Sequence, residues 1–367
     1  MSTAIVVVTY NRTGSLKRLL RSLSEAEYKG RNDIPLIISV DNSGNQETAE
    51  AAEVFDWKYG EKRVIRHGER LGLKRHILEC GEYTREYGSI IMLEDDLYVS
   101  PCFYDYAVRA LEFTKEDDRI GGVSLYAHRF NVFARLPFEP LNDGFSNWYF
   151  QFASSWGQAW TEGQWSGFYS WLKAHDGEAV GDSYLPSDIA GWGESSWLKY
   201  ADRYLGDSDK YFLYPRLSYT TNFADEGEHA SNSVTDLQVP LAEGEEGLRF
   251  CGLDESRAVY DAYFEQRGLE HEADLYGLKG RDGRHRERYI YSTGAYGCRI
   301  VESYGLKLKP MEANILHGIE GQDIFLYDTQ TPDRPPKLRA GRLEAYFYPG
   351  MNLEKMTGLI KRRLSGR

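Results

Sequence analysis

The first 125 residues alternate short apolar runs with amphipathic stretches, and this alternation limits the possible folds more than any other feature. Five apolar, β-rich runs predict strands at residues 4–9, 36–41, 63–66, 89–93 and 120–124. Leucines at helical spacing predict a helix after the first strand, and a second helix is expected over about 73–87. Pro101 opens a third helix that reaches about residue 113. Repeated strand–helix units predict a parallel sheet with helices on both faces.

Three polar clusters directly follow predicted strands. They are Thr9–Arg12, Asp41–Ser43 and the acidic triplet Glu94–Asp96. In α/β sheets, ligands collect at the carboxyl ends of the strands. We therefore expect the three clusters to line one crevice.

The acidic triplet predicts a metal site. Three adjacent carboxylates repel one another unless a cation neutralises them. Mg²⁺ or Mn²⁺ typically takes one or two carboxylates together with substrate phosphates. The alternative is a solvated loop or a helix N-cap, because Asp is common in front of a helix. The position of the triplet after an apolar strand favours the metal–phosphate role.

Two common phosphate-binding patterns are absent from the sequence. There is no GxxxxGK[ST] loop, and no GxGxxG follows the first predicted strand. A nucleotide would then be held by side chains and a metal ion. The basic candidates for a diphosphate are Arg12, Arg66, Lys74 and Arg75, although each alone is more often a surface charge. The net charge of −12 argues against general nucleic-acid binding, which depends on neutralising phosphates.

Three ordered motifs in the first 106 residues resemble one enzyme family. The motifs read IVVVTYNR, ISVDNSG and IIMLEDDLYVSPCFYDY. They resemble the nucleotide-sugar half of GT-A glycosyltransferases, both of the family-2 type and of the N-acetylglucosaminyltransferase I type. The resemblance continues in SSWGQAWTEGQW, GWGESSW and YPRLSYTTNFADEGEHAS, which look like the acceptor half of bacterial polysaccharide-type members. Residues 306–328 also look like the C-terminal part of such transferases.

The resemblance implies a fold and an order of domains. It predicts an α/β GT-A domain over residues 1–235, in which 1–125 bind the nucleotide-sugar and 126–235 bind the acceptor. A mostly helical extension would follow over residues 236–367, because much of 237–288 is charged and helical in pattern.

The resemblance also implies donor and metal contacts. Asp41 would accept a hydrogen bond from the base, and Thr9 would pack beside it, with Tyr10 in the same donor-binding turn. Glu94 would lie near the ribose or diphosphate, and Asp95 would also contact the donor. Asp96 would coordinate Mn²⁺ or Mg²⁺ directly, and His229 resembles a late metal or diphosphate ligand. The run before His229 departs from the glycine-rich pattern of the family.

Glu194 occupies the place of the catalytic base in this resemblance. Many relatives have Glu-Asp there, whereas Ser195 follows Glu194, and Asp188 is a rival base. Inverting sugar transfer needs a base that takes the proton of the acceptor hydroxyl. Between Trp192 and Trp197, partial desolvation is expected to raise the pKa of Glu194. The alternative is that Glu194 caps a helix that begins near Ser195.

Seven of the eight tryptophans lie between residues 148 and 197. Core packing accounts for most of them. Trp156 and Trp192 each neighbour a glycine, and we expect Trp156, Trp160 and Trp192 to form a platform for the sugar rings of the acceptor.

The charge is unevenly distributed along the chain. Residues 334–367 contain nine basic and two acidic residues, a net +7, so the rest of the chain has −19. Residues 351–367 have the pattern of a short amphipathic helix that could contact an anionic membrane, although a solvated helix fits equally well. No signal peptide or membrane span is apparent, and the four cysteines have no CxxC spacing. These features predict a reduced cytoplasmic protein with possible peripheral contact to the inner face of the membrane.

The prediction is a metal-dependent inverting glycosyltransferase that uses a nucleotide-sugar, most simply a UDP-sugar. Its acceptor would be a glycan or lipid-linked glycan. One alternative is a sugar-phosphate nucleotidylyltransferase, although residues 10–14 match its glycine-rich basic loop poorly. A second alternative is a non-catalytic glycan-binding module. A retaining transferase also stays open, because sequence does not locate the base relative to the anomeric carbon.

Overall fold

The computed structural model describes residues 3–175, 177–178, 185–225, 237–244, 247–283, 285–348 and 350. The chain divides into two compact units. The larger unit comprises Met1–Arg129 and Asn142–Ala262, and the smaller comprises Phe130–Leu141 and Tyr263–Arg367. The functional division at residues 235/236 stays a prediction.

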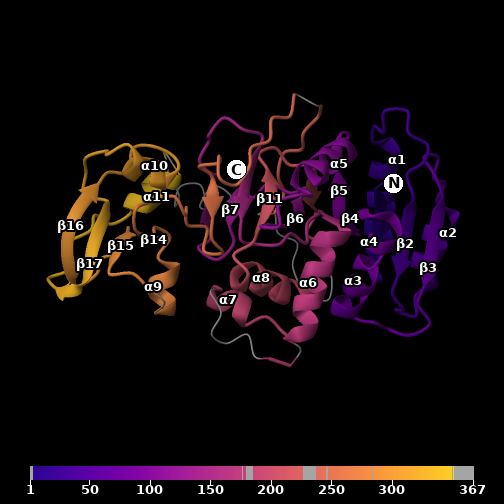
Figure 1. Cartoon of the computed structure of the whole chain (residues 1–367), viewed down its shortest axis with the longest axis horizontal. Coiled ribbons are helices and arrows are strands. Elements are labelled where there is room, and N and C mark those ends of the chain that lie inside the picture. The colour runs from indigo at the N-terminus through magenta and orange to yellow at the C-terminus, as the bar shows by residue number, and fades with distance from the viewer. Residues whose placement is uncertain are drawn as a thin grey trace, which may run out of the picture. The chain divides into compact units, whose positions relative to one another are not determined.

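A nine-stranded mixed sheet forms the centre of the larger unit (Figure 1). Its order is β13-β9-β11-β6-β10-β4-β1-β2-β3. The strands are β1 (Ala4–Thr9), β2 (Leu36–Val40), β3 (Lys62–Arg66), β4 (Ser89–Glu94), β6 (Ile120–Ser124), β9 (Asn147–Phe150), β10 (Gln158–Thr161), β11 (Tyr211–Pro215) and β13 (Val259–Tyr260). β4, β1, β2 and β3 are parallel, and β10 runs antiparallel between β4 and β6. The predicted α/β class is confirmed. A short antiparallel pair of β5 (Leu97–Val99) and β12 (Thr220–Asn222) lies beyond β4.

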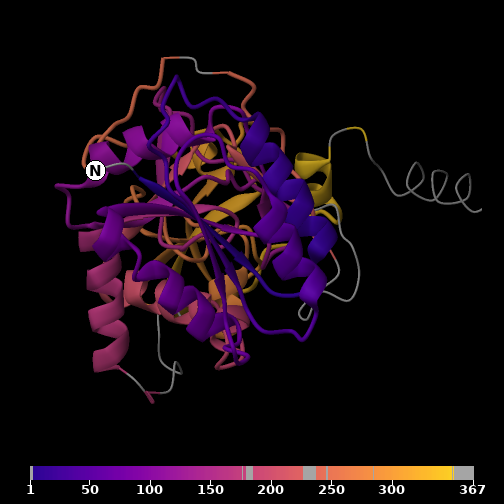
Figure 2. The same cartoon turned by 90° about the vertical axis from the view of Figure 1, so that its right-hand side faces the viewer.

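Helices cover both faces of this sheet (Figure 2). The described helices of the larger unit are α1 (Thr13–Glu25), α2 (Gln46–Val54), α3 (Leu73–Gly81), α4 (Thr84–Tyr87), α5 (Phe103–Thr114), α6 (Glu162–Ala174), α7 (Ser187–Ala190) and α8 (Trp197–Asp207). On one face, Ile5 and Val7 share a core with the buried leucines of α1 and with residues of α2 and α5. On the other face, Ser39 contacts His76 of α3, and Trp160 packs against Trp165 of α6. The alternation along the strands therefore separates two cores.

The helix expected over 73–87 is broken into α3 and α4. The break follows Gly81, a residue type with low helix propensity. A side chain at Gly81 would overlap the indole of Trp165, so the glycine permits close packing of α6. The prediction of one continuous helix was wrong because this tertiary contact is not visible in a local pattern.

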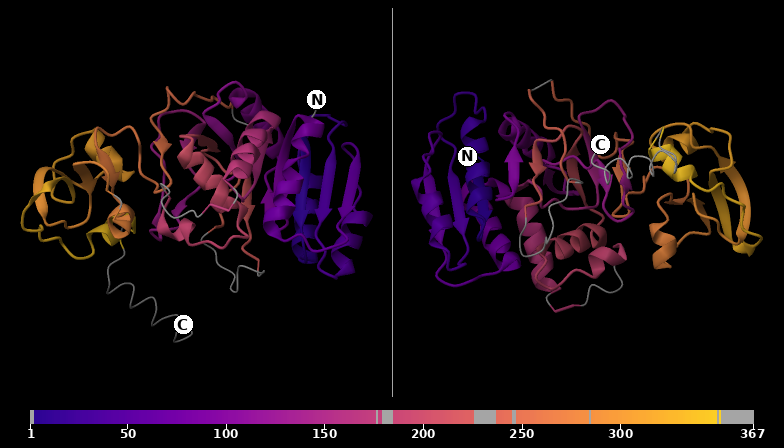
Figure 3. Two further views of the ribbon diagram at one scale, coloured as in Figure 1. Left: turned by 60° about the horizontal axis from the view of Figure 1, so that its bottom comes forward. Right: turned by 180° about the vertical axis from the view of Figure 1, so that it is seen from behind.

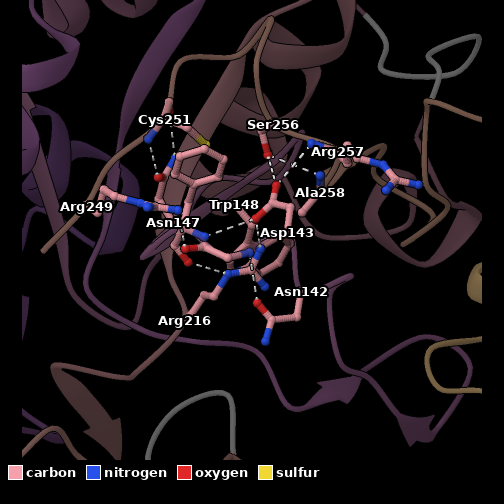
Figure 4. A network of polar contacts seen from close by, with 12 residues as sticks. Asn142, Asp143, Asn147, Trp148, Arg216, Arg249, Cys251, Ser256, Arg257 and Ala258 are labelled. Carbon is pink, nitrogen blue, oxygen red and sulfur yellow. Dashed lines mark hydrogen bonds and ion pairs between the residues drawn. The ribbon is translucent and has the colours of Figure 1, made fainter.

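A polar network fastens residues 249–258 to the edge of the large sheet (Figure 4). The carboxylate of Asp143 accepts bonds from Arg216 at 2.6 Å, from the Ser256 hydroxyl at 2.9 Å and from the Arg257 amide at 3.0 Å. Burial acts to raise the pKa of Asp143, but the bond from Ser256 and the charge of Arg216 outweigh it and lower the pKa. Asn147 exchanges two hydrogen bonds with the backbone of Cys251. These contacts explain why the larger unit reaches residue 262.

The smaller unit is built on a four-stranded sheet, drawn in orange and yellow in Figure 3. The sheet has the order β14-β15-β17-β16, and a two-stranded β7–β8 pair belongs to the same unit. The elements are β7 (Phe130–Asn131), β8 (Leu136–Pro137), β14 (Glu272–Asp274), β15 (Tyr289–Ser292), β16 (Cys298–Tyr304), β17 (Ile324–Pro332), α9 (Leu278–Asp282), α10 (Met311–Leu316) and α11 (Arg342–Phe347).

The expectation of a mostly helical extension needs correction. Helices are present, but strands contain more of its described residues than helices do. Charged side chains that suggested helix instead hold turns together. The Asp274 carboxylate accepts bonds from the backbone amides of Lys279 and Gly280, both at 2.9 Å, and Glu272 accepts from the amide of Arg286 at 3.0 Å. Within the described residues, no helix has the length and apolarity needed to cross a membrane. All four cysteines are free thiols.

Candidate active site

Three neighbouring parallel strands bring their polar ends to one edge of the large sheet. Thr9 at the end of β1 is in register with Val40 at the end of β2, and Val8 is in register with Glu94 at the end of β4. Asp41 directly follows β2. The three polar clusters therefore end at one edge of the sheet, and the crevice that they were expected to line stays a prediction.

Arg12 links the ends of β1 and β4. Its guanidinium forms ion pairs with Asp95 and, at 3.0 Å, with Asp96. The Thr9 hydroxyl donates to the other oxygen of Asp95 at 2.7 Å. Burial acts to lower the pKa of Arg12, and the charges of Asp95 and Asp96 outweigh it and raise the pKa. Arg12 is therefore a fixed counter-ion of the triplet, and its guanidinium is already committed to carboxylates.

One guanidinium does not balance three carboxyl groups. Burial, followed by the charge of Asp96, raises the pKa of Glu94 to about 8. Burial also raises the pKa of Asp95, against the opposing charge of Arg12. Asp96 has one oxygen, Oδ1, that is buried and has no hydrogen-bond partner among the described residues. A carboxylate oxygen in this state is suited to a hard cation.

The described residues contain no group of three or more His, Cys, Asp or Glu side chains arranged to hold a metal ion. His229, the second expected ligand, lies outside the described residues. The fit to a metal ion therefore depends on the buried Oδ1 of Asp96, which has no hydrogen-bond partner among the described residues.

The carboxylate of Asp41 organises the neighbouring turn. It is buried and accepts hydrogen bonds from three backbone amides, those of Asn42 at 2.8 Å, Leu71 at 2.7 Å and Gly72 at 3.0 Å. These bonds hold residues 71–72, at the start of α3, against the end of β2. Asp41 is thus rigidly placed at the edge where a donor base is expected.

The other basic candidates do not gather at the triplet. Arg66 pairs with Glu53 at 3.0 Å, and Arg75 pairs with Glu69 and Glu79. Lys74 places its amine 3.6 Å from the ring centroid of Tyr200. The ring of Tyr10 faces the guanidinium of Arg70 at 5.0 Å. Arg12 pairs with the triplet, whereas Arg66 and Arg75 pair with carboxylates elsewhere.

Residues 223–225, which are distant in sequence, also contact the triplet. The Phe223 amide donates to the carbonyl of Asp96 at 3.0 Å. Asp225 accepts from Ser15 at 2.6 Å and pairs with Arg18, whose guanidinium also lies 3.9 Å from the Phe223 ring centroid. The sequence analysis missed this fastening, because nothing local connects α1 to a segment about 200 residues later.

Glu194 lies in the turn before α8, with its side chain 77% exposed. The Tyr200 hydroxyl donates to its Oε2, and the Lys199 amine donates to its Oε1 at 2.9 Å. The bond from Tyr200 and then that from Lys199 lower the pKa of Glu194. The expected rise in pKa was wrong, because desolvation at this exposed position is weaker than the two bonds.

The alternative interpretation was that Glu194 caps a helix. The N-cap of α8 is instead Ser196. The Ser196 hydroxyl accepts from the amide of Lys199 at 3.3 Å and satisfies one free donor of the first turn. Glu194 therefore does not act as the N-cap. The rival base Asp188 lies in α7 and is exposed.

The three candidate tryptophans differ in exposure. Trp160 is fully buried in a core with Trp165 and Phe212, and its indole donates to Gln158 at 2.7 Å. It cannot contact a sugar, so its assignment to the acceptor site was wrong. Trp156 and Trp192 are partly exposed and stay candidates.

A pocket of about 490 Å³ lies beside α3. Its walls include Lys74 and Arg75 of α3, Tyr169 of α6, and Ser195, the neighbour of Glu194. Two donor candidates and the turn of the candidate base therefore adjoin one cavity, in a size range that suits small ligands.

Comparison with known protein families finds a similarity in the N-terminal part of the chain. Residues 4–154 match the model of glycosyl transferase family 2. No curated protein matches the chain. Among solved structures, S. aureus TarS 1–349 in complex with UDP-GlcNAc is similar, with 14% identity and a TM-score of 0.41 over 64% of this chain and 62% of that chain.

A second similar structure is the mannosyltransferase PcManGT from Pyrobaculum calidifontis in complex with GDP-Man and Mn²⁺. It has 15% identity and a TM-score of 0.34 over 47% of this chain and 46% of that chain. In both cases the similarity spans less than two thirds of the solved chain.

Proposed function

We propose that the chain moves a sugar from a nucleotide-sugar to a hydroxyl of a glycan or lipid-linked glycan, because residues 4–154 match the model of glycosyl transferase family 2. The observation that supports this best is the shared edge of β1, β2 and β4. There Thr9, Asp41 and the acidic triplet lie together, within the residues that match the family. The proposed donor is a UDP-sugar.

The donor is proposed to bind along this edge. Asp41, fixed by three backbone amides, would accept from the base, with Thr9 and Tyr10 beside it. Glu94 and Asp95 would lie near the ribose and diphosphate. Lys74 and Arg75, which line the pocket, would supply positive charge on the α3 side.

Asp96 is the proposed ligand of a divalent cation, Mn²⁺ or Mg²⁺. The buried Oδ1 of Asp96 is available to it, while Oδ2 holds Arg12. When bound, the cation offsets negative charge on the departing diphosphate. His229 stays a proposed second ligand, outside the described residues.

Glu194 is the proposed base. Its carboxylate would take the proton of the acceptor hydroxyl while that oxygen bonds to the anomeric carbon and the bond from this carbon to the diphosphate oxygen breaks. The exposure of Glu194 supports this role, because an acceptor can reach it. Asp188 is the alternative base, and Trp156 and Trp192 are the proposed aromatic contacts of the acceptor. Attack from the side opposite the diphosphate would invert the anomeric centre.

A thermal-shift screen of nucleotide-sugars with and without Mn²⁺ tests the donor site. We expect one nucleotide-sugar to raise the Tm, with a larger shift when Mn²⁺ is present. A transfer assay with that donor and a panel of glycans should then release the nucleoside diphosphate. Absence of both stabilisation and release would contradict the proposal. Pyrophosphate release from a nucleoside triphosphate and a sugar phosphate would instead indicate a nucleotidylyltransferase.

Contact with a membrane is a separate proposal that concerns residues 351–367, outside the described residues. Removal of these residues should shift the protein from the membrane fraction to the soluble fraction of a cell lysate. An unchanged distribution would contradict it.

A further inference from the structure

Both carboxylate oxygens of Glu194 are held by side chains from the first turn of α8. Lys199 donates to Oε1 at 2.9 Å, and Tyr200 donates to Oε2. The Lys199 amine also donates to the carbonyl of Trp192 at 2.9 Å. Lys199 therefore joins the two ends of the turn 192–199 and fixes the plane of the carboxylate within it.

Burial within this pair is unequal. The Lys199 side chain is 6% exposed, whereas that of Glu194 is 77% exposed. Burying an ammonium group is costly unless it is paired and hydrogen-bonded. An exposed ion pair contributes little to stability, because water screens it. The ammonium group of Lys199 is buried and the carboxylate of Glu194 is exposed, so this contact favours a role of Lys199 in orienting the Glu194 side chain.

A third group approaches from another element. Lys74 of α3 lies 3.6 Å from the ring centroid of Tyr200, and its charge also acts on Glu194. Tyr200 is buried, so its ring and hydroxyl are held between α3 and α8. The charged and titratable groups that face Glu194 are thus Lys199 and Tyr200 on α8 and Lys74 on α3.

We propose that Lys199 and Tyr200 are positioning residues that keep Glu194 oriented and ionised for proton transfer from the acceptor. This inference rests on the proposed function. The two donors stabilise the charged form of Glu194, so the carboxylate stays deprotonated at mildly acidic pH. Its intrinsic basicity is lower in return, and the gain lies in a fixed direction for the proton that it receives.

The direct test is a titration of Glu194 by NMR in the full chain labelled with ¹³C at glutamate Cδ. The spectrum of Glu194→Gln identifies the resonance. We expect Lys199→Met to raise the apparent pKa of Glu194 by about half a pH unit, since an adjacent positive charge is lost at an exposed site. Lys199→Arg keeps the positive charge, so its Glu194 pKa should stay close to that of the wild type. Lys115→Met is the control, because it removes a lysine at the C-cap of α5 that pairs with Glu112 and not with Glu194.

The kinetic test is the pH profile of kcat/KM for nucleotide release from the donor found in the screen. In Lys199→Met and Tyr200→Phe, we expect the acidic limb to move to higher pH. We also expect kcat to fall about tenfold or more, because small misplacements of a catalytic group are costly. The KM of the donor should stay unchanged.

Two results would overturn the inference. The first is a folded Lys199→Met variant whose Glu194 pKa and pH profile equal those of the wild type. The second is a loss of Tm in Lys199→Met and Tyr200→Phe with the profile unmoved, which would indicate a purely structural contact. A wild type that neither binds nor turns over any nucleotide-sugar would refute the proposed function, and with it the role in proton transfer. In that case the NMR titration would still report whether Lys199 controls the pKa.

Discussion

The two acidic sites of the larger unit are opposites in burial and in how their charge is balanced. The triplet has Asp95 buried and bonded to Arg12, and Asp96 Oδ1 has no hydrogen-bond partner within the part of the chain that the structure describes. Glu194 is exposed, and its partner Lys199 is the buried member of the pair. At the triplet the structure needs more positive charge, whereas at Glu194 positive charge is already supplied.

This difference assigns separate tasks to the two sites. Buried carboxylates with unbalanced charge attract a cation and, through it, an anionic diphosphate. An exposed and ionised carboxylate can accept a proton from a hydroxyl that approaches from solvent. Substitutions at the triplet should therefore change donor and metal binding, and substitutions at Glu194 should change proton transfer.

Glu194→Gln should have the largest effect. It keeps the shape of the side chain but removes the proton acceptor, and we expect kcat for sugar transfer to fall about a thousandfold. Binding of the nucleotide-sugar, measured by thermal shift, should be retained. Asp188→Asn is the matched control, because it removes the rival exposed acid of α7. Near-normal turnover of Glu194→Gln together with loss in Asp188→Asn would move the base to Asp188.

Asp96→Asn should have the next largest effect, with the opposite pattern. Replacing the proposed metal ligand should lower kcat/KM about a hundredfold and remove the extra Tm shift that Mn²⁺ gives with the donor. Asp117→Asn removes an acid of the same unit that pairs with Arg119, and it should leave both measurements unchanged. A Mn²⁺ effect that survives in Asp96→Asn would contradict the assignment.

The edge of the sheet could be predicted from the sequence because its signals are local. The run Ala4–Thr9 is a strand with the predicted bounds, and the polar residues after it follow from strand periodicity. Parallel pairing then requires Thr9 and Glu94 to lie at one edge. Such inferences need only the chain order and the rules of α/β sheets.

The remainder of the site depends on contacts between distant segments. Whether Trp160 is a core residue or a platform is decided by Phe212 and Trp165, which a sequence pattern does not place beside it. The pKa of Glu194 depends on which way Lys199 and Tyr200 point. A lysine five residues after a glutamate is a common pattern, so it gave no usable signal.

Thr9→Val should affect stability more than any step of the reaction. The substitution removes the hydroxyl that donates to buried Asp95 at 2.7 Å and leaves a carboxylate oxygen without that donor. We expect the free energy of unfolding to fall by about 2 kcal/mol, measured by urea denaturation. Thr114→Val is the control, because its buried hydroxyl donates to backbone carbonyls of its own helix and accepts from the uncharged side chain of Gln164. An equal loss of unfolding free energy in both variants would mean that the Thr9–Asp95 bond stabilises the fold no more than an ordinary buried hydroxyl bond does.

Trp192→Ala should have the smallest effect. It tests only whether the acceptor contacts the aromatic ring of Trp192 near Glu194. The indole is partly exposed beside Glu194, while the Trp192 carbonyl that accepts from Lys199 is backbone and survives the substitution. We expect the KM of the acceptor to rise about fivefold, the range for loss of one aromatic contact, with the donor-induced Tm shift unchanged. Trp171→Ala is the matched control, because Trp171 is also partly exposed but stacks on His175. If both variants change the KM of the acceptor equally, or neither does, Trp192 does not contact the acceptor, and the acceptor must approach Glu194 from another direction.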